Sequence, residues 1–138
     1  MKKTIYVLFV ILFISCHREF QSSNIWTVEF DTVSSSFYMK ERSNQKTQSA
    51  DQIVQMINRE NPSIQIELCK VSNDTAYVRI SDGEFLTQQS GTAGADSYLA
   101  IVVYNLSEFE NIEYINFDFE PGDHAMPGTY SRKDFINF

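Results

Sequence analysis

The chain has 138 residues, a formal net charge of -7 and two cysteines. Its length suits one domain with an apolar core, and it contains no internal repeat, low-complexity tract or second domain. Nucleic acids and anionic lipid headgroups are poor partners for so acidic a chain, since binding phosphates requires clustered lysine and arginine.

The N-terminal segment has the pattern of a secretory signal. Lys2 and Lys3 precede an unbroken apolar run from Ile5 to Ile14, and the small residue Ser15 stands directly before Cys16. The run is too short to cross a membrane, which requires about 20 apolar residues. With a cysteine after the small residue, the segment resembles a bacterial lipoprotein signal, in which the Cys16 thiol is acylated and becomes the new N-terminus.

We therefore predict a lipoprotein-type signal peptide over 1–15, an acylated cysteine and polar tether over 16–24, and a single domain over 25–138. Two acyl chains on Cys16 would anchor the protein stably, whereas a single chain would be marginal. The predicted location is extracytoplasmic, in the bacterial cell envelope. Phe13 stands where the lipoprotein pattern prefers an aliphatic residue, and ordinary secretion with cleavage nearby is the alternative.

If Cys16 is lipidated, Cys69 has no disulfide partner. It lies in an alternating run, which predicts a strand residue buried as a small apolar side chain. A Cys-His nucleophile is not indicated, because His17 lies in the tether and His124 in a turn-like stretch.

The first periodic segments predict a strand and a helix. Apolar and polar residues alternate over 25–30, which is the period of a strand with one buried face. After a loop, residues 37–43 form either a second extended piece or irregular chain. Ser49 and Gln52 make a capping box before apolar residues at helical spacing, and this helix should end near Asn61, before Pro62.

Two further strands, a helix and a last strand follow. Alternation over 64–68 and 76–80, around turn formers at 72–74, predicts a hairpin. Thr92 is the predicted N-cap of an amphipathic, sheet-facing helix. Its apolar stripe comprises Tyr98, Leu99, Val102, Leu106 and Phe109. The last strand carries Ile115, Phe117 and Phe119, before Pro and Gly residues break the regularity.

The predicted fold class is α+β: a two-layer sandwich of β-α-β-β-α-β order, with a mixed sheet and the helices on one face. A ferredoxin-like arrangement has the same succession, so the order of elements leaves open which strands are neighbours.

The run from Asn73 to His124 combines several motifs in order. A strand ends in a serine-containing turn at Val78 to Ser81, glycines follow at Gly91 to Gly94, and a helix ends in Asn-Leu-Ser-x-Phe at Asn105 to Phe109. A strand over Ile112 to Phe117 then leads to a Gly-acidic turn at Gly122 and Asp123. In this order the motifs resemble the GerMN domain of sporulation and germination proteins.

The opening strand and loop also fit that family, whereas its usual Gly-Pro after the first helix is replaced here by the residues at 58–62. GerMN domains are typically extracytoplasmic, often on lipoproteins, and have no catalytic activity. Their fold is similar to the ring-building modules of envelope complexes. The resemblance thus implies protein interaction rather than chemistry.

Gly91 and Gly94 precede the second helix, where glycines can either cradle a phosphate or allow a tight turn. No Lys-Ser/Thr follows them, and Asp96 is expected in the first helical turn, where its charge would repel a phosphate. We therefore predict that the glycines permit the turn and the close packing of the helix start on the sheet.

One acidic stretch could supply metal ligands. Asp118, Glu120 and Asp123 could hold Ca²⁺, and His124 could join a transition-metal site. The spacing is not that of an EF-hand and Pro-Gly is an ordinary turn signal, so we interpret the stretch as a solvated turn. Asp82 and Glu84 are interpreted as loop charges. No catalytic residue, metal ligand or cofactor is predicted.

The sequence thus predicts a non-catalytic, lipid-anchored domain that binds or assembles with envelope proteins through its sheet or aromatic loops. The alternative is a small-molecule or glycan-binding lipoprotein that uses exposed aromatics such as Tyr77 or Tyr130, and a metal-dependent enzyme comes third. A concave pocket lined by aromatics would favour the ligand binder, and an exposed sheet or edge strand would favour assembly.

Overall fold

The computed structural model describes residues 24–42, 49–109, 111–136 and 138. In chain order its elements are β1 (Trp26–Asp31), β2 (Ser36–Glu41), α1 (Ala50–Glu60), β3 (Glu67–Ser72), β4 (Thr75–Arg79), the π-helical turn η1 (Phe85–Gln89), α2 (Gly91–Leu106), β5 (Tyr114–Asp118), β6 (Gly128–Tyr130) and the 3₁₀ turn η2 (Arg132–Phe135).

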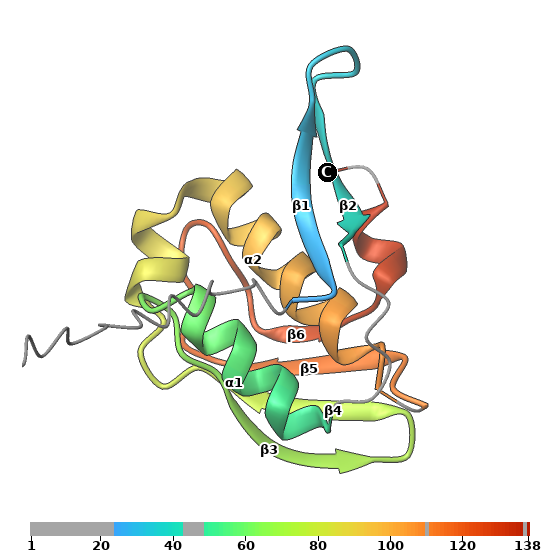
Figure 1. Ribbon diagram of the computed structural model, residues 1–138. Helices are drawn as coiled ribbons and strands as arrows, with labels where there is room; N and C mark the ends of the chain where they lie inside the picture. Colours follow the sequence, from blue (N-terminus) through green and yellow to red (C-terminus); the bar gives the residue numbers. More distant parts are fainter. Residues whose placement is uncertain (1–23, 43–48, 110, 137) are drawn as a thin grey trace, which may run out of the picture.

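The larger sheet has four strands in the order β3-β4-β5-β6. β4 runs parallel to β5, whereas β3 and β6 pair antiparallel with their neighbours. Both long helices lie over the same face of this sheet (Figure 1). The predicted α+β class, with a mixed sheet and helices on one face, is therefore confirmed.

The main core lies between that sheet and the two helices. It includes Ala76, Val78, Ile115 and Phe117 from β4 and β5, Ile53 and Ile57 from α1, and Leu99 and Leu106 from α2, all at most 2% exposed. The intervening strand positions, such as Tyr77 and Asn116, are only partly buried. Strand alternation thus gives the sheet an apolar face under the helices and a polar face to solvent.

Helix α1 has the predicted boundaries. The Ser49 hydroxyl accepts a hydrogen bond from Gln52 N, and the Gln52 side chain accepts one from Ser49 N. The capping box is therefore confirmed. The helix ends at Glu60, and the backbone N–H of Asn61 donates to Ile57 O.

Helix α2 differs from the prediction in its start and its burial. It begins at Gly91 directly after η1, so Thr92 lies inside the helix and is not its N-cap. Tyr98, Leu99, Val102 and Leu106 are buried as predicted, but buried residues also occur outside that stripe. The amphipathic prediction was wrong because α2 contacts α1, β1, β2 and η2 as well as the sheet.

The first predicted strand is β1, but it does not join the larger sheet. It pairs antiparallel with β2, so the undecided stretch after the loop is a second strand. The turn between them is held by Asp31, which accepts hydrogen bonds from Val33 N and Ser34 Oγ, both at 2.8 Å. The hairpin projects from the rest of the domain (Figure 1).

The second hairpin, β3-β4, is confirmed, but its ladder begins at Glu67 rather than at the first alternating residue. The register shifts between Leu68 and Lys70, which leaves Cys69 unpaired at a bulge. Cys69 is exposed, so the prediction of a buried cysteine was wrong. A bulge on an edge strand turns a side chain out of the alternation on which that prediction rested.

The C-terminal region contains two elements that the sequence did not predict. The last predicted strand is β5, with Ile115 and Phe117 buried. After the Pro and Gly residues, β6 pairs antiparallel with β5, with Tyr130 opposite Ile115, and η2 follows.

Candidate interaction surface

The two glycines before α2 have different surroundings. Gly91 has φ +69°, a left-handed conformation that favours glycine, so its role in the turn is confirmed. An added Cβ at Gly94 would lie 3.1 Å from Ser90 Cβ and would meet no atom of the sheet within 4 Å, so the predicted packing on the sheet was wrong.

The closely packed glycine is instead Gly122, which the sequence marked only as a turn. A Cβ there would lie 2.6 Å from Thr87 Cβ and 2.5 Å from Gln88 Nε2. Gly122 thus lets the loop after β5 lie against η1, where Thr87 O accepts a hydrogen bond from His124 N at 3.0 Å.

Asp96 is not in the first turn of α2, which holds no acidic residue. The side chain is half-buried, and this burial raises the pKa of its carboxyl above the ordinary value. Its carboxyl therefore does not serve the helix start as the sequence suggested.

The side chains of the acidic stretch considered for metal binding contact different partners. Asp118 Oδ2 accepts from Arg79 Nε at 3.1 Å, and His124 Nδ1 lies 3.2 Å from Thr92 Oγ1. In the described part of the chain, no group of three or more His, Cys, Asp and Glu side chains could hold a metal ion. Asp82 Oδ1 accepts from Glu84 N, at 3.3 Å, within one loop.

The two aromatics considered for ligand binding do not share a site. The Tyr77 ring lies on the polar face of the sheet, with Lys70 Nζ 4.6 Å from its centroid. The Tyr130 ring packs against Phe117 and Phe135, and its hydroxyl donates to Met126 O at 2.8 Å. Tyr130 therefore contributes mainly to packing.

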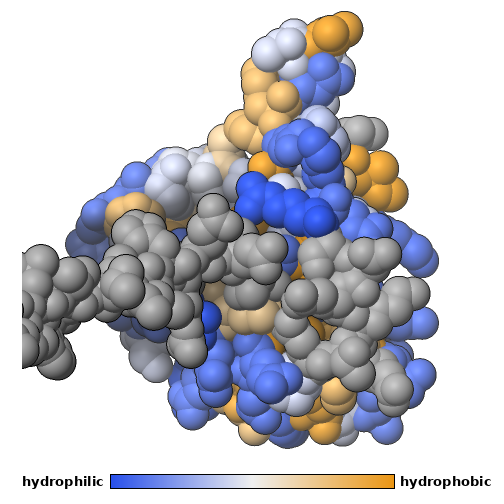
Figure 2. Space-filling view, viewed as in Figure 1, coloured by the Kyte–Doolittle hydropathy of each residue, from blue (hydrophilic) through white to orange (hydrophobic). Residues whose placement is uncertain are grey.

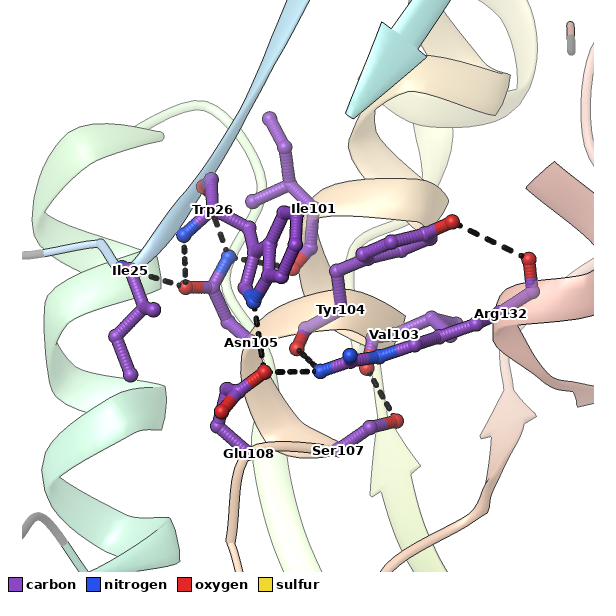
Figure 3. A network of polar contacts seen from close by, with 9 residues as sticks. All are labelled: Ile25, Trp26, Ile101, Val103, Tyr104, Asn105, Ser107, Glu108 and Arg132. Atoms are coloured by element: carbon purple, nitrogen blue, oxygen red, sulfur yellow. Dashed lines mark hydrogen bonds and ion pairs between the residues drawn. The ribbon is translucent and has the colours of Figure 1, made fainter. Parts of the chain in front are cut away.

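The base of the β1-β2 hairpin is attached to α2 by one fully buried amide (Figure 3). Asn105 Oδ1 accepts from Ile25 N at 2.9 Å and from Trp26 N at 3.1 Å. Asn105 Nδ2 donates to Trp26 O at 3.1 Å and to Ile101 O at 2.8 Å. The side chain thus occupies the backbone edge of β1 where the strand begins.

A second set of contacts surrounds the Trp26 side chain (Figure 3). Glu108 Oε1 accepts from Trp26 Nε1 at 2.8 Å and from Arg132 Nη2 at 2.5 Å. The Arg132 guanidinium lies over the rings of Trp26 and Tyr104, 5.2 and 4.9 Å from their centroids. These contacts join the first strand, the end of α2 and η2.

The Asn-Leu-Ser-x-Phe segment that carried the family resemblance therefore has a structural role in this chain. Asn105 and Glu108 hold the hairpin, Leu106 is in the core, and Phe109 packs against the core. Residue types alone did not reveal these contacts, since their partners lie about eighty positions away in the sequence.

A continuous series of aromatic rings connects the hairpin to the core, with neighbouring centroids 5.0–6.5 Å apart. In order it comprises Phe30, Phe37, Phe138, Phe135, Tyr130, Phe117 and Phe119. The inner members Phe117, Phe119 and Phe135 are buried, whereas Phe30 at the outer end is 51% exposed. The apolar surface therefore continues from the core to solvent along the hairpin.

Further apolar side chains are exposed in the hairpin turn and in the C-terminal segment, whose Phe138 O accepts a hydrogen bond from Phe37 N of β2. Val33 in the hairpin turn is 93% exposed, and Ile136, two residues before Phe138, is 63% exposed. We call Phe30, Val33, Phe37, Ile136 and Phe138 the hairpin surface. Figure 2 shows apolar residues at the tip of the projecting β1-β2 hairpin and on the part of the hairpin below the tip.

No family model, curated protein or solved structure matches the chain. The GerMN resemblance therefore stays a prediction from the sequence. Within the described ranges, no helix has the length and apolar character that crossing a bilayer requires.

A cleft of about 380 Å³ lies beside the C-terminal end of α2. Polar and apolar surface contribute about equally to its lining, which comprises Ser107, Ile112, Glu113, Tyr114, Ser131, Arg132 and Lys133. The volume is within the range of small-molecule sites, although such sites are usually more apolar. Tyr114 is the aromatic residue in this lining.

Proposed function

We propose that this protein is a non-catalytic, lipid-anchored domain of the bacterial cell envelope that binds another protein through the hairpin surface. The observation that carries the proposal is the exposure of Phe30 and Val33 on a hairpin that projects from the domain. Single exposed apolar residues are ordinary on any surface, whereas a contiguous apolar patch indicates an interaction site.

The attachment of the hairpin favours this role. Asn105, Glu108 and Arg132 hold its base through hydrogen bonds and ring contacts, so its orientation is largely set before a partner arrives. Binding then orders fewer groups, and more of the contact energy contributes to affinity.

The tether would keep the hairpin close to a membrane. Eight residue steps connect Cys16 to Asn24 and can span at most about 29 Å. Asn24 itself is buried, and its Nδ2 donates to Glu60 Oε2 at 2.6 Å. Asn24, which the sequence analysis assigned to the tether, thus contacts α1. A partner would be another envelope component within short reach.

Cys16→Ser is expected to move the protein from the membrane fraction to the soluble secreted fraction, because the acyl chains could no longer be attached. Fractionation after salt and carbonate washing measures this, and circular dichroism should show an unchanged fold. Cys69→Ser is the matched control and should stay with the membrane. Retention of the Cys16 variant on washed membranes would contradict lipid anchoring.

A photo-crosslinking side chain placed at Val33 is expected to yield a discrete adduct in the native cell. The same side chain at Val71, an exposed residue on β3 at 42% exposure, is the control. Phe30→Ser should weaken the Val33 adduct, because it removes an adjacent apolar contact. Equal labelling from both positions, or none from Val33, would count against the proposal. An adduct of two copies would identify self-assembly.

The alternative of a small-molecule or glycan-binding lipoprotein is favoured by the cleft beside Tyr114 and Arg132. The cleft suits the stacking of a glycan less well than an aromatic groove would, because its lining contains one aromatic residue, Tyr114, and Arg132 is already bonded to Glu108.

A further inference from the structure

The outer edge of β1 has backbone groups that point away from β2. Successive residues of an antiparallel strand face the partner and the outside alternately. The backbone N–H of Trp26 on β1 points away from β2, because it donates to Asn105 Oδ1. The backbone N–H of Phe37 on β2, opposite Phe30, points away from β1, because it donates to Phe138 O. By the same alternation the N–H and C=O of Val28 and Phe30 also point outward.

Asn105 occupies the edge only at Trp26. Among the described residues, no backbone or side-chain group is hydrogen-bonded to the outward N–H and C=O of Val28 or Phe30. Exposed strand edges of this kind are templates for pairing with another chain. The four unoccupied groups lie directly beside the exposed Phe30 side chain.

The two faces of β1 differ in chemistry. Val28 and Phe30 lie on its apolar face, and Glu29 and Asp31 on the opposite face. Hydrogen bonds from Lys40 and Tyr38 lower the pKa of Glu29, and those from Val33 N and Ser34 lower the pKa of Asp31. Both carboxyl groups are therefore charged at neutral pH.

We propose that an extended segment of a partner protein adds to the free edge of β1 as a new strand. The inference rests on the proposed function, in which the hairpin is the binding surface. The segment has apolar residues, which meet Val28 and Phe30, alternating with lysine or arginine, which meet Glu29 and Asp31. Backbone hydrogen bonds supply affinity, and the alternating side chains supply specificity.

A second copy of this chain fits the edge poorly. Antiparallel pairing of Val28 with Phe30 of a second copy sets Glu29 opposite Glu29, and pairing of Phe30 with Phe30 sets Glu29 opposite Asp31. Like charges directly opposite each other destabilise strand pairs. Pairing of Val28 with Val28 sets Phe30 opposite Trp26, whose edge Asn105 already occupies.

Amide hydrogen exchange of the full chain in non-ionic detergent micelles tests the proposal. The probe is a peptide of about eight residues, an ordinary strand length, that alternates valine with lysine. The amides of Val28 and Phe30 should exchange rapidly in the free protein and at least about tenfold more slowly with the peptide bound. A peptide alternating valine with glutamate is the control and should give little protection.

Two variants separate backbone pairing from side-chain contact. Val28→Pro removes an outward N–H without breaking a β1-β2 hydrogen bond, and should weaken binding of the peptide about tenfold. Val28→Thr keeps the N–H and should bind nearly as well as the wild type. If the proline variant does not fold, the exchange measurement on the wild type decides by itself.

Protection of Val28 and Phe30 in the free protein would overturn the inference, because the edge would already be occupied. Equal protection by both peptides would overturn the charge pattern, and no protection would overturn strand addition. A crosslink from Val33 without protection by either peptide would leave the hairpin a binding surface but exclude this mode. Protection without any Val33 crosslink in cells would support the edge and contradict the proposed function.

Discussion

Truncation of Leu106 to alanine is expected to lower the free energy of unfolding by about 2–5 kcal/mol. Leu106 is fully buried. Leu99 lies on the same helix and is only 2% exposed, so Leu99→Ala should have an effect of similar size. Each variant removes apolar contacts and leaves a cavity where α2 packs on the domain. Because a domain is typically stable by only about 5–15 kcal/mol, either loss should be large.

Urea unfolding followed by circular dichroism measures this effect. Asp96→Ala is the control on the same helix, since its half-buried carboxyl is outside the first turn and fills no fully buried site. It should shift the urea midpoint far less than either leucine variant. Similar midpoints for Leu106→Ala and Asp96→Ala would contradict the packing of α2 described above.

Asn105→Ala is expected to lower the free energy of unfolding by at least about 2 kcal/mol, although it removes few apolar contacts. The amide satisfies Ile25 N, Trp26 N, Trp26 O and Ile101 O, and it is fully buried. Alanine cannot replace any of these hydrogen bonds. The buried groups would lose their partners, and the base of the hairpin would lose its attachment to α2.

The single tryptophan of the chain reports on this region directly. Trp26 begins β1, so its fluorescence emission should shift to longer wavelength in the Asn105 variant as the hairpin base becomes more accessible to water. Asn116→Ala is the matched control, because Asn116 Nδ2 makes an exposed hydrogen bond to Thr129 Oγ1 at 2.8 Å. Equal destabilisation by both variants, with unchanged Trp26 emission, would contradict the role assigned to Asn105.

Elements that depend on neighbours in the sequence were predicted well. The capping box at Ser49 and Gln52 and the turn between β3 and β4 involve residues only a few positions apart. In the turn, Asn73 adopts φ +56°, a conformation that asparagine tolerates better than most residues. Such local signals are complete within the segment itself, so no knowledge of the tertiary structure is needed to interpret them.

The sequence predicted a type of surface but not the residues that form it. The sequence favoured an interaction domain with aromatic loops, but it did not indicate that Phe30 would project into solvent while Phe117 would be buried. Both residues lie in alternating apolar patterns. Their different exposure results from the partner that each strand receives: α2 packs against β5, whereas the outer part of β1 projects from the domain.

By itself the sequence determined the α+β class, the helix boundary at Asn61 and the two hairpin strands around Asn73, because periodicity and capping signals are local. The acylation of Cys16 stays a prediction from the sequence. Only the tertiary structure decided that β1 pairs with β2 rather than with the larger sheet, that Cys69 is exposed at a bulge, and that β6 is a strand of three residues. These outcomes depend on contacts between distant segments. Asn105 can attach the hairpin only once folding brings α2 beside residues about eighty positions earlier.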